Sequence, residues 1–363
     1  MKFIPLRKLA LATFAAALMF ASPSLAQDSP SLTEVVEAWL ASPHADRSSE
    51  AFIHWNEEGA VPENCATCHS GPGFMDFVGA DGTAAGTVDH PAPIGSPVDC
   101  ATCHNEAASK LQSVTFPSGV VMSELGSASV CMVCHQGRES TDSVDAAVAD
   151  IDDDAVSKDL GFLNVHYRAA AATLMGGAAR GGYQYDGKDY AQRFNHPAPL
   201  NTCTGCHNPH TTQAATAQCA ACHKDIETPK AIRASAVDAD GDGDTTEGIA
   251  AEITALHDRL AAAIRAYAAD VAGTPIAYEA HSYPYFFADT NGDGQAGADE
   301  AIFPNRYQSW TPRLMRAAYN YQFVAKDPGA WTHNPHYAIQ LLFDSLESLS
   351  EKAAVDMGGL VRP

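Results

Sequence analysis

The stretch that decides the fold of this chain is CTGCHNPHTTQAATAQCAACH, residues 203–223. It begins and ends with the same pattern, in which two cysteines are separated by two residues and followed at once by histidine. The pattern occurs five times and accounts for all ten cysteines of the 363-residue chain. The copies are Cys65-Ala-Thr-Cys68-His69, Cys100-Ala-Thr-Cys103-His104, Cys131-Met-Val-Cys134-His135, Cys203-Thr-Gly-Cys206-His207 and Cys219-Ala-Ala-Cys222-His223.

Cys-x-x-Cys-His is the pattern to which haem is attached covalently. The two thiols form thioethers with the haem, and the adjacent histidine supplies one axial ligand of the iron. Disulfides and zinc sites also use Cys-x-x-Cys, but neither explains why histidine follows in all five copies. The sequence therefore predicts five haem c groups, one at each motif.

The first 26 residues have the features of a secretory signal peptide. They combine a basic start, an apolar run over residues 9–21 and a cleavage site of small residues before Gln27. The apolar run is too short to cross a bilayer of about 30 Å comfortably, and no cysteine near the cleavage site could carry a lipid. We therefore expect an exported protein, periplasmic or extracellular, with no membrane anchor.

The chain is strongly acidic, with 44 acidic against 22 basic residues and a formal charge of −22. Such a surface argues against nucleic acids and anionic membranes as partners. It suits a cationic redox partner or calcium binding, although solubility alone explains it equally well.

The motifs lie between residues 65 and 223, and none follows up to Pro363. We expect a pentahaem region over residues 27–230, where the haems supply much of the buried apolar surface. Residues 231–363 are expected to form a helical C-terminal region. Apolar spacing predicts a helix over residues 247–271, and Thr311-Pro312 and Asn334-Pro335 each predict the start of another. The predicted fold is mainly α with extensive loops and little β, organised around haem.

Ten histidines lie outside the motifs and could supply the second axial ligands. Local context favours those near a motif, in an apolar stretch or at the start of a helix. The candidates are His54, His166, His196 and His210, with His90 and His333 as alternatives for the fifth position. His44 and His257 are expected to be bystanders.

Two acidic loops resemble EF-hand loops, in which oxygens at positions 1, 3, 5, 7 and 12 surround Ca²⁺. In the first, these positions are Asp289, Asn291, Asp293, the carbonyl of Gln295, and Glu300. The second begins with Asp238, Asp240 and Asp242 but has Ile249 at position 12, so Glu247 or Glu252 would have to substitute. The alternative for the second loop is a solvated acidic linker.

The doubled motif from Cys203 to His223, with Asn-Pro-His after its first copy, resembles multihaem cytochromes c. The segments around His54, His166 and residues 327–337 are similar to the same group. These are electron-transfer proteins of the periplasm and cell exterior, including outer-surface and filament-forming cytochromes of metal-respiring bacteria. The resemblance implies closely spaced bis-histidine haems. The implied partners are redox proteins or extracellular electron acceptors, with self-assembly into filaments as a further option.

A competing hypothesis is a multihaem oxidoreductase that acts on small nitrogen or sulfur compounds. Such an enzyme needs one five-coordinate haem. Some relatives of this kind replace the motif histidine by lysine, and that replacement is absent here. The acidic surface would also repel anionic substrates. Electron transfer is therefore the leading hypothesis.

Overall fold

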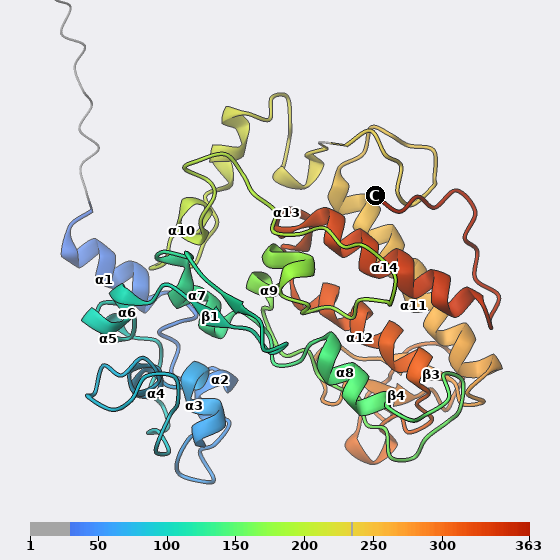
Figure 1. Cartoon of the computed structure of the whole chain (residues 1–363), viewed down its shortest axis with the longest axis horizontal. Coiled ribbons are helices and arrows are strands. Elements are labelled where there is room, and N and C mark those ends of the chain that lie inside the picture. Colours follow the sequence, from blue (N-terminus) through green and yellow to red (C-terminus); the bar gives the residue numbers. More distant parts are fainter. Residues whose placement is uncertain (1–29, 234) are drawn as a thin grey trace, which may run out of the picture.

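The computed structural model describes residues 30–233 and 235–363, so the expected signal peptide lies outside the described residues. Helices joined by long loops dominate the fold (Figure 1). The α-helices are α1 (Leu32–Leu40), α2 (Glu50–Ile53), α3 (Glu63–His69), α4 (Gly71–Phe77), α5 (Cys100–Cys103), α6 (Glu106–Lys110), α7 (Ala128–Cys134), α8 (Thr141–Val148), α9 (Ala170–Met175), α10 (Cys203–Cys206), α11 (Ile249–Asp270), α12 (Pro312–Lys326), α13 (Ala330–His333) and α14 (Pro335–Ser350). The 3₁₀ helices are η1 (Gly176–Ala178), η2 (Thr216–Ala221), η3 (Pro229–Ala231) and η4 (Phe303–Asn305).

Strands are short and few in the part of the chain that the structure describes. β1 (Val114–Thr115) pairs antiparallel with β2 (Val121–Met122), and β3 (Ile276–Tyr278) pairs antiparallel with β4 (Phe286–Ala288). The prediction of a mainly α, loop-rich fold with little β is confirmed.

The three helices predicted in the C-terminal region are present as α11, α12 and α14, and they pack against one another. Their starts follow from local chemistry. The Thr311 side chain accepts a hydrogen bond from the amide of Leu314 (3.2 Å), and the Asn334 side chain accepts one from the amide of Tyr337 (3.2 Å). A proline in the first turn of each helix costs no hydrogen bond, because that amide has no partner inside the helix.

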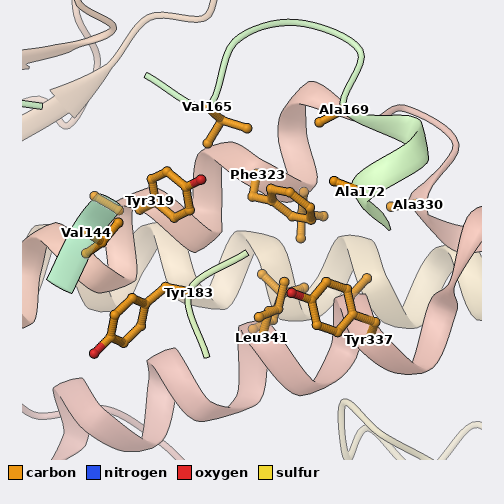
Figure 2. Close-up of a cluster of buried hydrophobic side chains, with 14 of the residues drawn as sticks. Val144, Val165, Ala169, Ala172, Tyr183, Tyr319, Phe323, Ala330, Tyr337 and Leu341 are labelled. Atoms are coloured by element: carbon orange, nitrogen blue, oxygen red, sulfur yellow. The ribbon is translucent and has the colours of Figure 1, made fainter. Parts of the chain in front are cut away.

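The core of the molecule lies between these helices and the middle of the chain. Figure 2 shows Tyr319 and Phe323 of α12 beside Tyr337 and Leu341 of α14, with Ala172 of α9 against them. The same hydrophobic cluster extends from residue 74 to residue 349, so it includes residues from the motif-bearing part of the chain. No helix in the two described ranges is both long enough and apolar enough to cross a bilayer.

The segment that carries the fourth and fifth motifs has a different character. None of the described residues from 191 to 238 is buried. Near the first motif, a small separate cluster forms around Val61, Ala66 and Ala92. The segment with the fourth and fifth motifs, unlike the first motif, therefore forms no hydrophobic core of its own among the described residues.

Candidate haem sites and calcium loops

Four of the five motifs are built on a single helical turn. The first and third motifs end α3 and α7, whereas the cysteine pairs of the second and fourth motifs are α5 and α10. On a helical turn, residues three apart face the same side, so both thiols of a motif can reach one ligand. The next residue is the histidine, and in motifs two to five its amide donates to the carbonyl of the first cysteine (2.8–3.0 Å). The fifth motif begins in η2.

Thiols of different motifs lie close to one another. Cys68 contacts Cys134, and Cys131 contacts Cys203. The other pairs are near enough to interact electrostatically, and they are Cys206 with Cys219 and Cys103 with both Cys131 and Cys134. The third motif thus lies between the first and the fourth, the fifth follows the fourth, and the second lies beside the third. All ten cysteines are free. In the described part of the chain, no cysteine belongs to a group of three or more metal-binding side chains, as a structural zinc site would require.

Four motif histidines face a second histidine. The pairs, with the distances between ring centroids, are His69 with His166 (5.6 Å), His104 with His210 (6.2 Å), His135 with His44 (6.4 Å) and His207 with His333 (6.3 Å). Metal–imidazole bonds of about 2.0 Å place two ligating nitrogens on opposite sides of one metal roughly 4 Å apart, and their ring centroids roughly 6 Å apart. Three of the four spacings match this value, so the residues fit an iron between the rings.

The pair formed by His69 and His166 is tighter, with 3.3 Å between the two Nε2 atoms, so these rings must separate by roughly 0.7 Å to hold a metal between them. Burial lowers the pKa of His69, and it lowers the pKa of His166 to about 4. Both rings are therefore neutral at physiological pH, which is the form that binds a metal. The Nδ1 of His69 donates to the carbonyl of Ala51 (2.8 Å), which leaves its Nε2 free to face His166.

The fifth motif histidine, His223, lies near His196. Burial lowers the pKa of His196, and the neighbouring His223 lowers it further. His196 is therefore the candidate for the second ligand at this site, without the ring-to-ring contact that the other four pairs make among the described residues.

Two candidates from the sequence are placed elsewhere. His54 lies near His69, but its Nδ1 donates to Glu50 (2.8 Å) one helical turn away, and 60% of its side chain is exposed. The exposed His90 pairs with Asp89 and Asp76. The structure does not pair either ring with a motif histidine.

His44 is the histidine that sequence reasoning set aside and that the structure brings to a motif. Burial lowers its pKa, and its ring faces His135. His44 lies far from that motif in the sequence, so no local pattern marks it. The expected bystander His257 stacks on Tyr321, and its Nε2 contacts the Tyr321 carbonyl oxygen (2.9 Å).

The first acidic loop curls around its own carboxylates. Ligand oxygens of Asp289, Asp293 and Glu300 lie within 4.8 Å of one another. Backbone amides of the loop donate hydrogen bonds to these side chains at 2.7–3.2 Å. Asp289 accepts from the amides of Gly292 and Gly294, and Glu300 accepts from those of Thr290 and Asn291. Asn291 accepts from the amide of Asp293, and Asp293 accepts from that of Gln295. Hydrogen bonds from Thr290 lower the pKa of Glu300, which keeps it charged.

The second loop has the same hydrogen-bond pattern, and Glu252 of α11 takes the place that Glu300 has in the first. Asp238 accepts hydrogen bonds from the amides of Gly241 and Gly243, and Glu252 accepts from those of Ala239 and Asp240. Asp240 accepts from the amide of Asp242, and Asp242 accepts from that of Asp244. Ligand oxygens of Asp238, Asp240 and Glu252 lie within 4.8 Å of one another. Burial, together with Asp242 and Glu252, raises the pKa of Asp240.

Arg233 distinguishes the second loop from the first. It pairs with the second carboxylate oxygen of Glu252, whose side chain is fully buried. Glu247, the other substitute considered, lies in a neighbouring cluster with Asp240 and Asp242, and burial raises its pKa to about 6. The geometry therefore favours Glu252 as the last residue of the loop.

Comparison with known proteins gives relatives of one kind. The chain is 28% identical to the C-type polyheme cytochrome OmcB of Geobacter sulfurreducens over 83% of this chain and 46% of the relative. It is 27% identical to the C-type polyheme cytochrome OmcC of the same organism, over 83% and 45%. The chain thus spans about half the length of the curated relatives it matches.

No protein-family model and no solved structure matches the chain. The five attachment motifs, the histidines that face them and the similarity to polyhaem cytochromes lead to one assignment. They support the interpretation of the chain as a multihaem c-type cytochrome.

Proposed function

We propose that the protein transfers electrons through five haem c groups, each held by two thioethers, a motif histidine and a second histidine. The observation that carries the proposal is that four of the five motif histidines face a histidine from the same chain, and that His196 lies near the fifth. Bis-histidine ligation fills both axial positions in both oxidation states, so electron transfer changes the coordination little and leaves no open site.

The proposed ligand sets follow the order of the motifs. They are Cys65, Cys68, His69 and His166; Cys100, Cys103, His104 and His210; Cys131, Cys134, His135 and His44; Cys203, Cys206, His207 and His333; and Cys219, Cys222, His223 and His196. When bound, haem supplies the one-electron chemistry. The chain holds the imidazoles in place, and burial lowers the pKa values of His44, His135 and His207 so that they stay neutral.

The order of the thiols gives the proposed path. Electrons move between the first, third, fourth and fifth haems in that order, and the second haem branches from the third. An oxidoreductase would instead need an iron with one open position, and the proposed pairing leaves none.

We expect the purified holoprotein to carry five covalent haems that are low-spin in both oxidation states. Haem staining of denaturing gels with a pyridine haemochrome assay gives the stoichiometry, and carbon monoxide addition to the reduced protein tests for open sites. Three or fewer haems in matured protein would contradict the assignment. High-spin haem together with turnover of nitrite or hydroxylamine would favour the enzyme instead.

We further propose export to the periplasm or cell exterior, and exchange of electrons with redox proteins or extracellular acceptors. Export is what haem attachment and the expected signal peptide require. Because the five partner histidines come from this chain, a filament of such subunits would not need a histidine donated by a neighbour. Negative-stain microscopy of the secreted fraction tests whether filaments form.

Both acidic loops are proposed to bind Ca²⁺, the first through Asp289, Asn291, Asp293, Gln295 and Glu300, and the second through Asp238, Asp240, Asp242 and Glu252. Arg233 already takes one oxygen of Glu252 and adds a positive charge. The second loop should therefore bind more weakly, because Ca²⁺ affinity depends on the charge of the ligands.

Chelation of calcium is expected to lower the melting temperature, because an ion bound only to the folded state stabilises it by mass action. At a free Ca²⁺ concentration of 100 times Kd, one site contributes about 2.7 kcal/mol. Replacing Asp289 and Glu300 together by Asn and Gln should remove most of the effect in a thermal melt followed with and without chelator. The matched control replaces the exposed carboxylates Glu57 and Glu58, which belong to neither loop, by Gln. If chelation leaves the wild-type melting curve unchanged and no calcium copurifies, the loops are only turns.

A further inference from the structure

A buried carboxylate holds the ring of His333. Asp327 follows the last residue of α12 and is 3% exposed. Its two oxygens lie 2.9 and 2.8 Å from Nδ1 of His333, and one of them also accepts a hydrogen bond from the amide of Gly329 (3.0 Å). The carboxylate is therefore fixed by its own turn and can act on the imidazole without moving.

The other side of the same ring is fixed by a glycine. A Cβ on Gly329 would lie 2.6 Å from Cε1 and 3.0 Å from Nδ1 of His333, which is closer than real contacts allow. The imidazole thus packs against a bare Cα while Nδ1–H donates to Asp327. This arrangement fixes the tautomer and leaves the lone pair on Nε2, on the ring that faces His207.

The other paired histidines have weaker partners. The Nδ1 of His69 donates to the carbonyl of Ala51 (2.8 Å), and the Nδ1 of His135 donates to the carbonyl of Arg168 (3.2 Å). The Nδ1 of His166 is buried without a partner among the described residues. Within residues 30–233 and 235–363, His333 is the one paired histidine whose ring contacts a carboxylate.

A carboxylate is a stronger acceptor than a carbonyl, because the hydrogen bond is charge-assisted. It makes the imidazole a more basic ligand and places negative charge near the metal, and both effects favour the more positive, oxidised iron. An imidazole whose Nδ1 has no partner is a poorer donor of electron density to the metal.

We infer that Asp327 is a positioning residue that makes the fourth haem the lowest in reduction potential. The inference rests on the proposed function, in which His333 ligates the fourth iron. Electrons therefore run downhill from the fourth haem to its neighbours.

The test is Asp327→Asn in the intact holoprotein, followed by a spectroelectrochemical titration. Asparagine has the same shape but no charge, so the lowest midpoint potential should rise while the other four stay in place. A tenfold change in that haem's reduction equilibrium corresponds to about 59 mV. Asp327→Glu keeps the carboxylate, so the lowest midpoint potential should stay near its wild-type value. The control Asp270→Asn removes the same charge from an exposed position at the end of α11, and it should shift no potential.

A second variant keeps the inference testable if asparagine perturbs folding. Gly329→Ala leaves the carboxylate in place but displaces the ring, so the low-spin electron paramagnetic resonance signal of one haem should change. If Asp327→Asn protein with five haems keeps all five wild-type potentials, the inference is wrong.

His333→Ala separates this inference from the proposed function. An iron that opens to carbon monoxide in that variant shows that His333 is a ligand, so unchanged potentials in Asp327→Asn would then overturn the role of Asp327 alone. If His333→Ala opens no iron, the ligand assignment of the fourth haem is wrong, and the inference fails with it.

Discussion

Replacing His44 by alanine should open one iron to external ligands. His44 faces His135 with 6.4 Å between the ring centroids, and burial lowers its pKa so that the ring is neutral. Without this ring, the third iron has one protein ligand on its axis. The reduced variant should show a high-spin fraction equal to one haem in the five proposed, and it should bind carbon monoxide where the wild type does not. Absorption spectra with and without carbon monoxide measure both effects.

His54→Ala is the matched control, since it removes the same side chain from the neighbouring part of the chain. The His54 ring is 60% exposed and pairs with Glu50, so its removal should leave every iron closed. Carbon monoxide binding in His54→Ala and none in His44→Ala would reject the pairing and restore the expectation from the sequence.

Removing the third haem should disconnect the first from the fourth. The thiols of the third motif lie beside both Cys68 and Cys203, so this haem occupies the middle of the proposed path. In the double variant Cys131→Ala and Cys134→Ala, electrons must cross the width of a missing haem. Electron exchange between the first and the fourth haem should slow by orders of magnitude, as measured by rapid reduction kinetics.

The control for this variant removes a haem at the end of the path, through Cys219→Ala and Cys222→Ala. It also leaves four haems but keeps the first, third and fourth in series, so exchange among them should stay fast. Met132 and Val133 between the third pair of cysteines are buried and unchanged, and circular dichroism checks that the variant keeps the helix content of the wild type. Equal rates in the two variants would contradict the proposed order.

The sequence predicted those parts of the fold that depend on neighbouring residues. Thr311 and Asn334 each cap the helix that starts beside them, so the signal and its effect lie within one turn. The attachment motifs are local in the same way. His54 shows the limit of such reasoning, because its apolar surroundings suggested a haem ligand, whereas Glu50 on the same helix holds the ring.

The partner histidines and the last residue of the second acidic loop depend on tertiary structure. His44 reaches His135 only because the N-terminal segment folds back onto α7. Glu252 lies beyond position 12 of its loop, and α11 returns it to the hydrogen bonds that Glu300 makes in the first loop. Spacing along the chain carries no signal for either contact.

The absence of buried side chains among the described residues from 191 to 238 bears on how the protein matures. A segment that buries no side chain gains too little from the hydrophobic effect to offset the entropy of ordering its backbone. The C-terminal helices, in contrast, belong to the large hydrophobic cluster that the described polypeptide forms by itself. If haem attaches to the fourth and fifth motifs as proposed, this segment gains buried apolar surface only after attachment. Covalent attachment is then expected to precede compaction of this segment.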